Sequence, residues 1–400
     1  MSKVLFLGMP SHGHVNPTIG LVKELVKQGE EVVYFSSEQF KEKVEKAGAI
    51  YKSYATDFDI FKMKKAGGAP GPMLTIIQSA DMIIEDILQQ TQDVQFDYVI
   101  HSAAFPLASA IVQILKMPNV SSLAVYAGLS KFFEAGKTGG GQAMQFMQNN
   151  ELKDAYKQSA EILYRKYGVE LPGNIMQMMF TKGDINLVYT SKYFAEDEPY
   201  FDDTYKFVGP PVADRSENVY FPFEQLHGKK VIYISLGTVF SNYSHQLYNI
   251  FFESFASIDA IIVMAAYNVD LSHFNIPANF IVKNYVPQSE ILKHTSAAIT
   301  HAGMNSISDL IYNNIPFVAL PMGADQPVLA KRAQDLGAAI SLDVNNLTTD
   351  ILRNAVETVM REPSYIENIK KISDSFKEAG GYAKAVEEIF TLKRMKGVNS

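Results

Sequence analysis

The sequence predicts an α/β protein of two domains, each built on a parallel, doubly wound sheet. Its length of 400 residues exceeds what one hydrophobic core usually supports. Short apolar runs alternate with helical repeats in both halves of the chain, which is typical of parallel sheets. Between the halves, residues 207–230 hold several prolines and glycines without sustained periodicity, and this pattern indicates a domain boundary.

The first half begins with an apolar, β-prone run at residues 3–8 and continues with helical spacing over 16–28. Asn16 and Pro17 are typical of a helix start, so we expect strand, loop and helix in that order. The further strands expected in this half are 31–36, 50–55, 97–101 and 119–124. Residues 130–183 are expected to be mostly helical, and their Met and Phe side chains predict an apolar pocket.

The second half repeats the alternation of strands and helices. Its expected strands are 231–237, 260–266, 279–284, 296–301 and 316–321. Residues 347–396 form a helical series broken at Pro363 and at Gly380 and Gly381. The domain boundaries that we expect are 1–210 for the N-terminal domain, 211–228 for a linker, 229–380 for the C-terminal domain and 381–400 for a helix that packs back on the N-terminal domain.

Composition and charge exclude several classes of protein. The chain has 36 Lys and Arg against 43 Asp and Glu, and the net charge of −7 argues against nucleic acid or anionic membrane as a partner. It has no cysteine, which excludes disulfides, thiolate nucleophiles and Cys-ligated zinc. His12, His14 and Pro17 interrupt the N-terminal apolar run before signal-peptide length, and no segment reaches the roughly 18 to 20 apolar residues of a spanning helix. We expect a soluble, cytoplasmic protein without stable membrane insertion.

The strongest local signal is the segment 285–326. A strand ends at His301, and Gly303 lies in the loop that follows it. A helix then opens with Asn305 and Ser306, so free backbone N–H groups and the positive end of the helix dipole predict a diphosphate site. The glycine lets the backbone come close, and the polar side chains offer hydrogen bonds without a metal. The alternative is an ordinary turn in which Asn or Ser caps the helix.

In order and spacing, this segment resembles the donor-binding signature of the family 1 UDP-glycosyltransferases. Their GT-B fold has two facing Rossmann-like domains with an interdomain cleft, and the family includes plant secondary-metabolite enzymes and bacterial macrolide glycosyltransferases. Our chain is most similar to the macrolide-glycosyltransferase-like group of Bacillus-like bacteria. The run Ser235–Leu236–Gly237–Thr238, which ends the first strand of the second domain, resembles the family's Ser-x-Gly-Ser/Thr loop.

The resemblance implies that the C-terminal domain binds a UDP-sugar and that the N-terminal domain binds the acceptor. The donor residues that it implies are Tyr285 for stacking on uracil, with Val286 beside it, Gln288 and Asp309 for the ribose, Thr238, His301, Gly303, Asn305 and Ser306 for the diphosphate, and Asp325 and Gln326 for the sugar hydroxyls. Two of these positions depart from the family pattern. Asp309 stands where the family usually has Glu, and its side chain is shorter by one methylene; the alternative is a solvated carboxylate in the first turn of a helix. Tyr285 replaces the Trp of plant members and still offers a flat face.

A candidate base follows the first strand. Gly13, His14, Asn16 and Pro17 match the family's GHxNP element, in which the histidine removes the proton of the acceptor hydroxyl. This histidine is expected at the carboxyl edge of the first sheet, where α/β proteins place their sites. The unperturbed pKa of histidine, near 6.5, suits a base at neutral pH. From the residues alone, the alternative is a structural histidine that caps the following helix.

Related enzymes place an Asp after the strand near residue 100 to orient this base, and our chain has Ser102 there. A serine hydroxyl can hydrogen-bond an imidazole but brings no negative charge, so it should raise the pKa of His14 less than a carboxylate would. We therefore expect a weaker base and a preference for phenolic acceptors, whose pKa is about 10. Strand alternation points the neighbouring His101 away from this face.

One base without a second carboxylate nucleophile indicates a single displacement that inverts the anomeric centre. We expect no metal and no cofactor apart from the UDP-sugar as co-substrate, because no His/Asp cluster has ligand spacing. The resemblance implies transfer of glucose from UDP-glucose to a small apolar hydroxylated acceptor such as a flavonoid, terpenoid, steroid or macrolide. Two alternatives stay open: a UDP-sugar epimerase of the same fold, which needs no acceptor, and a non-catalytic nucleotide-sugar-binding subunit. A dehydrogenase is disfavoured, because no G-x-G-x-x-G follows the first strand.

Overall fold

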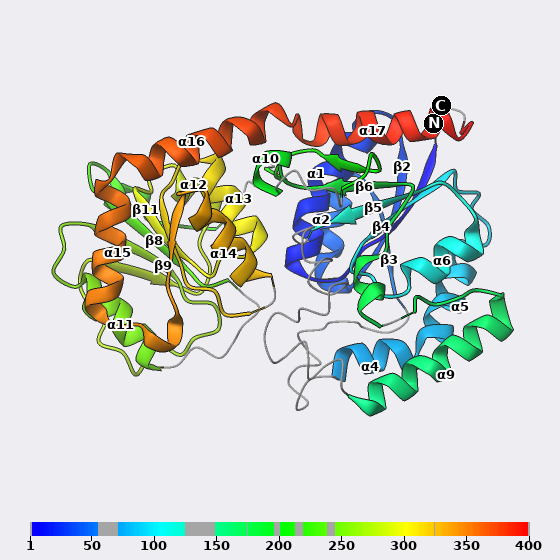
Figure 1. The fold of residues 1–400 in the computed structure, drawn as a ribbon, viewed down its shortest axis with the longest axis horizontal. Coiled ribbons are helices and arrows are strands. Elements are labelled where there is room, and N and C mark those ends of the chain that lie inside the picture. The colour runs from blue at the N-terminus through cyan, green and yellow to red at the C-terminus, as the bar shows by residue number, and fades with distance from the viewer. Residues whose placement is uncertain are drawn as a thin grey trace. The chain divides into compact units, whose positions relative to one another are not determined.

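The computed structural model describes residues 2–54, 71–124, 149–173, 175–195, 201–212, 219–237, 245–323 and 325–398 (Figure 1). The chain divides into two compact units, Met1–Pro211 together with Ala379–Ser400, and Val212–Glu378. Each unit contains a parallel sheet with helices packed on it, which confirms the predicted α/β class and the doubly wound sheets. Within the described ranges, no helix is both long and apolar enough to cross a membrane.

The chain order of the first sheet reverses between two neighbouring strands. The strands are β1 (Lys3–Leu7), β2 (Glu31–Ser36), β3 (Ile50–Ser53), β4 (Tyr98–Ser102), β5 (Asn119–Leu123), β6 (Ile185–Val188) and β7 (Tyr205–Phe207). Across the sheet they run β3-β2-β1-β4-β5-β6-β7, and Leu7 of β1 is paired with His101 of β4. The carboxyl ends of β1 and β4 therefore form a topological switch point, the place where open α/β sheets bind their ligands.

The second sheet has a switch point of the same kind. Its strands are β8 (Val231–Ser235), β9 (Ile261–Ala265), β10 (Phe280–Lys283), β11 (Ala297–Thr300), β12 (Phe317–Ala319) and β13 (Ala339–Ser341). They run β10-β9-β8-β11-β12-β13, and Ser235 at the end of β8 is paired with Thr300 at the end of β11. A ligand site is therefore expected beyond these two strand ends.

Helices cover both faces of the first sheet, because its strands send apolar side chains to both sides. In β1, Val4 and Phe6 belong to the core under α1 and α17, whereas Leu5 and Leu7 belong to the core under α5 and α6. The helices of this unit are α1 (His12–Lys27), α2 (Lys41–Lys46), α4 (Gly71–Gln78), α5 (Ala80–Thr91), α6 (Ala108–Leu115), α9 (Asn150–Tyr167), α10 (Lys192–Ala195) and α17 (Gly381–Met395), with 3-10 turns η1 (Glu38–Phe40) and η3 (Ile175–Phe180). Each fully buried Leu or Phe stabilises the fold by about 1.5–3 kcal/mol.

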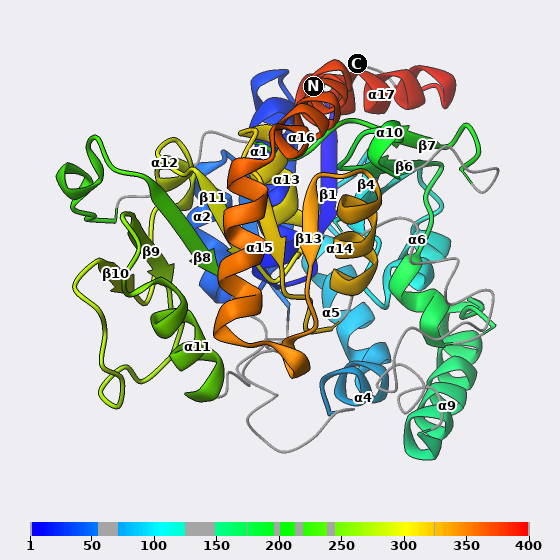
Figure 2. The same cartoon turned by 60° about the vertical axis from the view of Figure 1, so that its left-hand side comes forward.

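The second unit is layered in the same way. Ile232 and Ile234 of β8 point into the core under α11 and α15, whereas Tyr233 points to the opposite face. The helices are α11 (His245–Phe255), α12 (Gln288–Leu292), α13 (Met304–Tyr312), α14 (Gln326–Asp335), α15 (Thr349–Arg361) and α16 (Pro363–Glu378), with 3-10 turns η4 (Phe223–Leu226) and η5 (Val344–Asn346). Figure 2 shows α15 along the face of the sheet, where it packs on β11, β12 and β13.

Helix α1 begins at His12, earlier than the start that we expected at Asn16. Ser11 has an extended backbone, and its carbonyl accepts the first helical hydrogen bonds. Pro17 therefore lies inside the helix, where its missing N–H removes one backbone hydrogen bond. The hydroxyl of Tyr382 on α17 donates to the carbonyl of Pro17 at 2.8 Å. The expected loop that carries the candidate base is thus the first turn of a helix.

Sequence patterns did not predict strands β6, β7 and β13. Each has only three or four residues, so no alternation of polar and apolar side chains can develop in it. β6 and β7 lie at one end of the first sheet, and β13 lies at one end of the second. Each extends a sheet that the other strands form. Tertiary pairing, and not local pattern, determines these strands.

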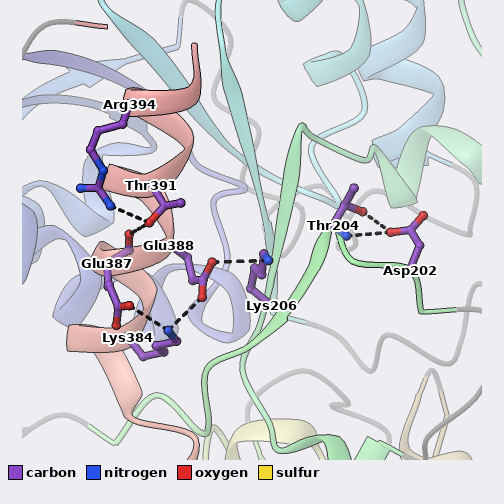
Figure 3. Close-up of polar contacts among 8 residues, drawn as sticks. All are labelled: Asp202, Thr204, Lys206, Lys384, Glu387, Glu388, Thr391 and Arg394. Atoms are coloured by element: carbon purple, nitrogen blue, oxygen red, sulfur yellow. Dashed lines mark hydrogen bonds and ion pairs between the residues drawn. The ribbon is translucent and has the colours of Figure 1, made fainter. Parts of the chain in front are cut away.

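Helix α17 is held on the first unit by apolar packing and by charge. Ala385 and Ile389 are buried in the core that α17 shares with α1. On another side of the helix, Glu388 lies between Lys384 of the same helix and Lys206 of β7, at N–O distances of 3.0 and 3.4 Å (Figure 3). Since ion pairs near the surface contribute about 0–1 kcal/mol, the packing is the larger stabilising effect.

One ion pair under α17 is buried. Lys393 Nζ lies 2.7 Å from an oxygen of Glu30, with 5% and 4% of the two side chains exposed. The hydroxyl of Tyr98 donates to the other carboxylate oxygen at 2.9 Å. Each charge has lost most of its hydration, so each depends on the other for compensation.

We expect Lys393→Met to lower the free energy of unfolding of the first unit by about 3–5 kcal/mol, because the carboxylate of Glu30 then stays buried and uncompensated. The double variant Glu30→Leu/Lys393→Met removes both charges and should be more stable than Lys393→Met. It should remain less stable than the native protein by about 1–3 kcal/mol, because the Tyr98 hydroxyl then lacks its partner. Urea unfolding followed by circular dichroism measures both changes. Lys384→Met, at a more exposed pair, is the control and should change stability by less than about 1 kcal/mol. A double variant that is no more stable than Lys393→Met would contradict this account.

Candidate active site

The first candidate site lies at the switch point between β1 and β4. After β1 the chain turns at Gly8, and a Cβ placed there would lie 2.5 Å from the ring of Tyr34 and 2.9 Å from the carbonyl oxygen of Phe35. The turn leads within a few residues to α1, so His14 lies in the first turn of that helix. Ser102 is the last residue of β4, next to β1. The fold thus brings together two residues that are far apart in the sequence.

His14 and Ser102 are within hydrogen-bond distance. The Nδ1 atom of His14 lies 3.3 Å from the Oγ atom of Ser102. Ser102 is buried, whereas His14 as a residue is partly exposed. Surrounding protein atoms still remove much of the hydration of the imidazole, and this burial lowers the pKa of His14 to about 4. The ring is therefore neutral at pH 7, the state that a base requires.

The serine hydroxyl leaves the tautomer of His14 open. Within the described part of the chain, His14 is the hydrogen-bond partner of the Ser102 hydroxyl. This hydroxyl can donate to Nδ1, which leaves the proton of the neutral ring on Nε2, or it can accept from a protonated Nδ1. Only the second arrangement leaves Nε2 free to accept a proton. A carboxylate can only accept, so it would enforce that second arrangement.

The two neighbouring histidines occupy different surroundings. His101 is fully buried on the opposite face of β4, as strand alternation predicts, and burial lowers its pKa to about 4. It is therefore closed to an acceptor. His12 is exposed, and its ring meets the ring of Phe40 edge-on at 5.0 Å. His14 is partly exposed, and its ring lies within hydrogen-bond distance of Ser102 at the end of β4.

The second candidate site lies at the switch point between β8 and β11. The imidazole of His301 lies between two glycines. A Cβ at Gly237 would come within 2.7 Å of the ring, and a Cβ at Gly303 would come within 2.5 Å of Nε2. Gly237 also has φ +77°, a conformation that L side chains rarely adopt. Both glycines are thus needed for the position of this ring, and burial lowers the pKa of His301 to about 4.

Helix α13 presents its N-terminus beside His301. Gly303 is the N-cap and has an extended backbone, and Asn305 and Ser306 are half-buried in the first turn. Ala302 has a left-handed φ of +64°, an uncommon value for a residue with a side chain. The first N–H groups of a helix lack partners within it, so together with the helix dipole they favour an anion such as a diphosphate.

Three side chains form a hydrogen-bonded series that includes Gln288 and Asp309, the two residues to which the family resemblance assigns the ribose. Gln288, at the start of α12, donates from Nε2 to an oxygen of Asp309 at 2.8 Å. The hydroxyl of Tyr233 on β8 donates to Oε1 of Gln288 at 3.1 Å. Asp309 is 9% exposed and lies beyond the first turn of α13. The alternative of a solvated carboxylate in a first turn is therefore wrong, because α13 buries this side chain.

The sequence analysis did not include Tyr233 among the site residues. The sequence could have indicated it, because Tyr233 stands two residues before Ser235 and strand alternation places the two side chains on the same face of the sheet. Tyr285, on the loop after β10, is 46% exposed, as an aromatic ring that stacks on a base must be, whereas Val286 is buried. Thr238 lies outside the described residues.

Gln326 is turned inward. It is 4% exposed, and its Oε1 atom accepts from the backbone N–H groups of Met322 and Gly323 at 2.8 and 3.2 Å. Asp325 is the N-cap of α14 and is partly exposed. Of this pair, Asp325 presents the more accessible polar group, and Gln326 fixes the turn after β12. Among the residues that the structure describes, no three His, Asp or Glu side chains are grouped as metal ligands.

Known proteins share both this sequence and this fold. A family model described as "UDP-glucoronosyl and UDP-glucosyl transferase" matches residues 209–380. The UDP-glucosyltransferase YdhE of Bacillus subtilis is 34% identical over 403 residues, which cover 99% of our chain and 100% of that protein. The UDP-glucosyltransferase YojK of the same organism is 32% identical, with 99% and 98% coverage. The NDP-glycosyltransferase YjiC of Bacillus subtilis is 26% identical, with 99% and 98% coverage.

Solved structures show the same architecture. The kitacinnamycin glycotransferase has a TM-score of 0.85 at 22% identity, and the alignment covers 98% of our chain and 99% of that one. The calicheamicin glycosyltransferase CalG4 has a TM-score of 0.78 at 22% identity, with 98% of both chains covered. These similarities establish the GT-B fold. Because two relatives exceed 30% identity along nearly their whole length, the chain belongs to the UDP-glycosyltransferase family, in the group of these Bacillus enzymes, and is a glycosyltransferase that uses a UDP-sugar.

Proposed function

We propose that this enzyme is an inverting, metal-independent glucosyltransferase. It transfers glucose from UDP-glucose to a hydroxyl, preferably phenolic, of a small apolar acceptor such as a flavonoid, terpenoid, steroid or macrolide. The names of YdhE and YojK as UDP-glucosyltransferases support glucose as the sugar that is transferred. The observation that carries the reaction type is the neutral, accessible His14 hydrogen-bonded to Ser102 at the switch point of the N-terminal domain.

The reaction is a single displacement. The acceptor hydroxyl gives its proton to Nε2 of His14 while its oxygen attacks the anomeric carbon. The bond from that carbon to the β-phosphate oxygen breaks, and UDP leaves with the electron pair. The N-terminus of α13 and the polar side chains beside it stabilise the charge that develops on the diphosphate. Attack from the side opposite the leaving group turns an α-linked donor into a β-glycoside.

The preference for phenols follows from the environment of His14. With a pKa of about 4, and with a hydroxyl instead of a carboxylate within hydrogen-bond distance of Nδ1, the imidazole is a weak proton acceptor. A phenol, with a pKa of about 10, ionises far more readily than an aliphatic alcohol and needs less help from the base. The apolar character of the acceptor is inferred from the Met- and Phe-rich segments 60–90 and 130–180, much of which lies outside the described residues.

The epimerase and the non-catalytic subunit make different predictions. An epimerase changes the sugar without any acceptor, and a binding subunit does not depend on His14. The names of the Bacillus relatives favour transfer over both. A direct assay of UDP release separates the three.

The first test is UDP release from UDP-glucose in EDTA, with and without a flavonoid acceptor. We expect release that requires the acceptor, persists in EDTA and falls about 100-fold in His14→Ala, the low end of what a positioned base contributes, because the base is weak and the acceptor is a phenol. His12→Ala is the matched control and should stay near the native rate. Saturable donor binding without release would support a binding subunit, and epimer formed without acceptor would support the isomerase.

The acceptor preference is tested on a phenol and an alcohol of matched size and shape. We expect kcat/KM for the phenol to exceed that for the alcohol by about 100-fold or more, because the weak base leaves ionisation to the acceptor. Comparable kcat/KM values for the two would refute the preference.

We expect Ser102→Asp to strengthen the base. A carboxylate beside Nδ1 fixes the required tautomer, stabilises the imidazolium and raises the pKa of His14 from about 4. The base acts when neutral, so the native enzyme should lose activity only as the pH falls toward 4, and the variant should lose it at higher pH. The pH profile of kcat/KM measures this shift, and the rate with an alcohol should rise more than with a phenol. Ser102→Asn, which adds no charge, is the control; an unchanged acid limb in Ser102→Asp would contradict the argument.

A further inference from the structure

The C-terminal unit contains a buried hydroxyl that the donor signature does not include. Tyr233 is 4% exposed on β8, and its hydroxyl donates to Oε1 of Gln288 at 3.1 Å. Gln288 in turn donates from Nε2 to Asp309 at 2.8 Å. These hydrogen bonds join side chains from three separate elements of the same unit, β8, α12 and α13.

Asp309 fixes the direction of the hydrogen bonds that join Tyr233, Gln288 and Asp309. An ionised carboxylate only accepts hydrogen bonds, so Asp309 requires the NH₂ group of Gln288 to face it. The amide oxygen then faces Tyr233, whose hydroxyl is a donor. If the amide were reversed, its oxygen would lie against the carboxylate, an arrangement that repels. Tyr233 thus supplies the donor that the amide oxygen needs in the orientation set by Asp309.

We propose that Tyr233 is a positioning residue for ribose recognition, which holds Gln288 so that Gln288 and Asp309 present one fixed pair of groups to the ribose hydroxyls. This inference rests on the proposed use of a UDP-sugar at this site. Asp309 has a side chain one methylene shorter than Glu and is buried in α13, so it cannot extend to follow a displaced ribose. Its interaction with the hydroxyls therefore depends on how firmly its neighbour is held.

Tyr233→Phe is the direct variant, because it removes the hydroxyl and keeps the ring in the core. We expect the Kd for UDP, measured by calorimetry, to rise about fivefold or more, which is the usual contribution of one hydrogen bond. The Kd for 2′,3′-dideoxy-UDP, which lacks both ribose hydroxyls, should change little. The preference of the enzyme for UDP over the dideoxy compound should therefore fall, while kcat at saturating UDP-glucose stays within about twofold.

The control is Tyr98→Phe, which also removes a buried tyrosine hydroxyl, in this case one bonded to the carboxylate of Glu30, but lies at the start of β4 in the other unit. The preference of the Tyr98→Phe variant for UDP over the dideoxy compound should equal that of the native enzyme. If the role of Tyr233 were purely structural, Tyr233→Phe would raise the Kd values for UDP and for the dideoxy compound by the same factor. That result would overturn the proposal. If the native enzyme bound neither compound, the proposed function itself would fall.

A second variant covers the case in which Tyr233→Phe does not fold. Gln288→Glu keeps an acceptor for the Tyr233 hydroxyl but removes the donor to Asp309 and places a second carboxylate there. We expect it to lose the preference for UDP over the dideoxy compound to at least the same extent. Retention of the native preference in Gln288→Glu would show that the chain does not position the ribose site.

Discussion

The parallel pairing of β1 with β4, and of β8 with β11, is the constraint on which both sites depend. Each pair joins strands whose onward connections diverge, so the two carboxyl ends stand side by side at a topological switch point. In the first unit this places the turn before His14 next to Ser102. In the second it places Gly237 next to His301. The register of the strands, fixed by buried apolar side chains on both faces, thus determines distances between polar groups that lie far apart in the sequence.

Close approach and burial explain the chemistry of the two histidines. His301 fits only because Gly237 and Gly303 carry no Cβ, and the same crowding removes water from its ring. His14 is also depleted of water, and burial lowers both pKa values to about 4. Both rings are neutral at pH 7, so neither brings a positive charge to a diphosphate. We therefore expect the helix N–H groups and the polar side chains beside them to stabilise the leaving group.

The sequence predicted those parts of the fold that depend on local pattern. Buried strands such as β1 and β8 are continuous apolar runs, and the motif residues at their ends needed only the topology of a parallel sheet to be placed. It could not predict β7 or β13, which are too short to carry a pattern, or the early start of α1, which depends on Ser11 and on the tolerance of Pro17 inside the helix. Gln326 shows the same limit at the site: the family resemblance implied a contact with the sugar, and only the fold reveals that its oxygen accepts from two backbone N–H groups.

The replacement of a carboxylate by Ser102 changes more than the charge at the base. A carboxylate beside an imidazole fixes the tautomer and also stabilises the imidazolium, because it accepts a hydrogen bond from the Nδ1–H group and its negative charge compensates the positive charge of the ring. A hydroxyl can do neither consistently, since it is both donor and acceptor and is neutral. Proton transfer then contributes less to lowering the barrier, so more of the rate must come from the leaving group and from the acidity of the acceptor. On the proposed mechanism we therefore expect the donor half to carry the larger share of the chemistry, so that the hydrogen bonds of Gln288 to Tyr233 and Asp309 bear on the rate at low donor concentration.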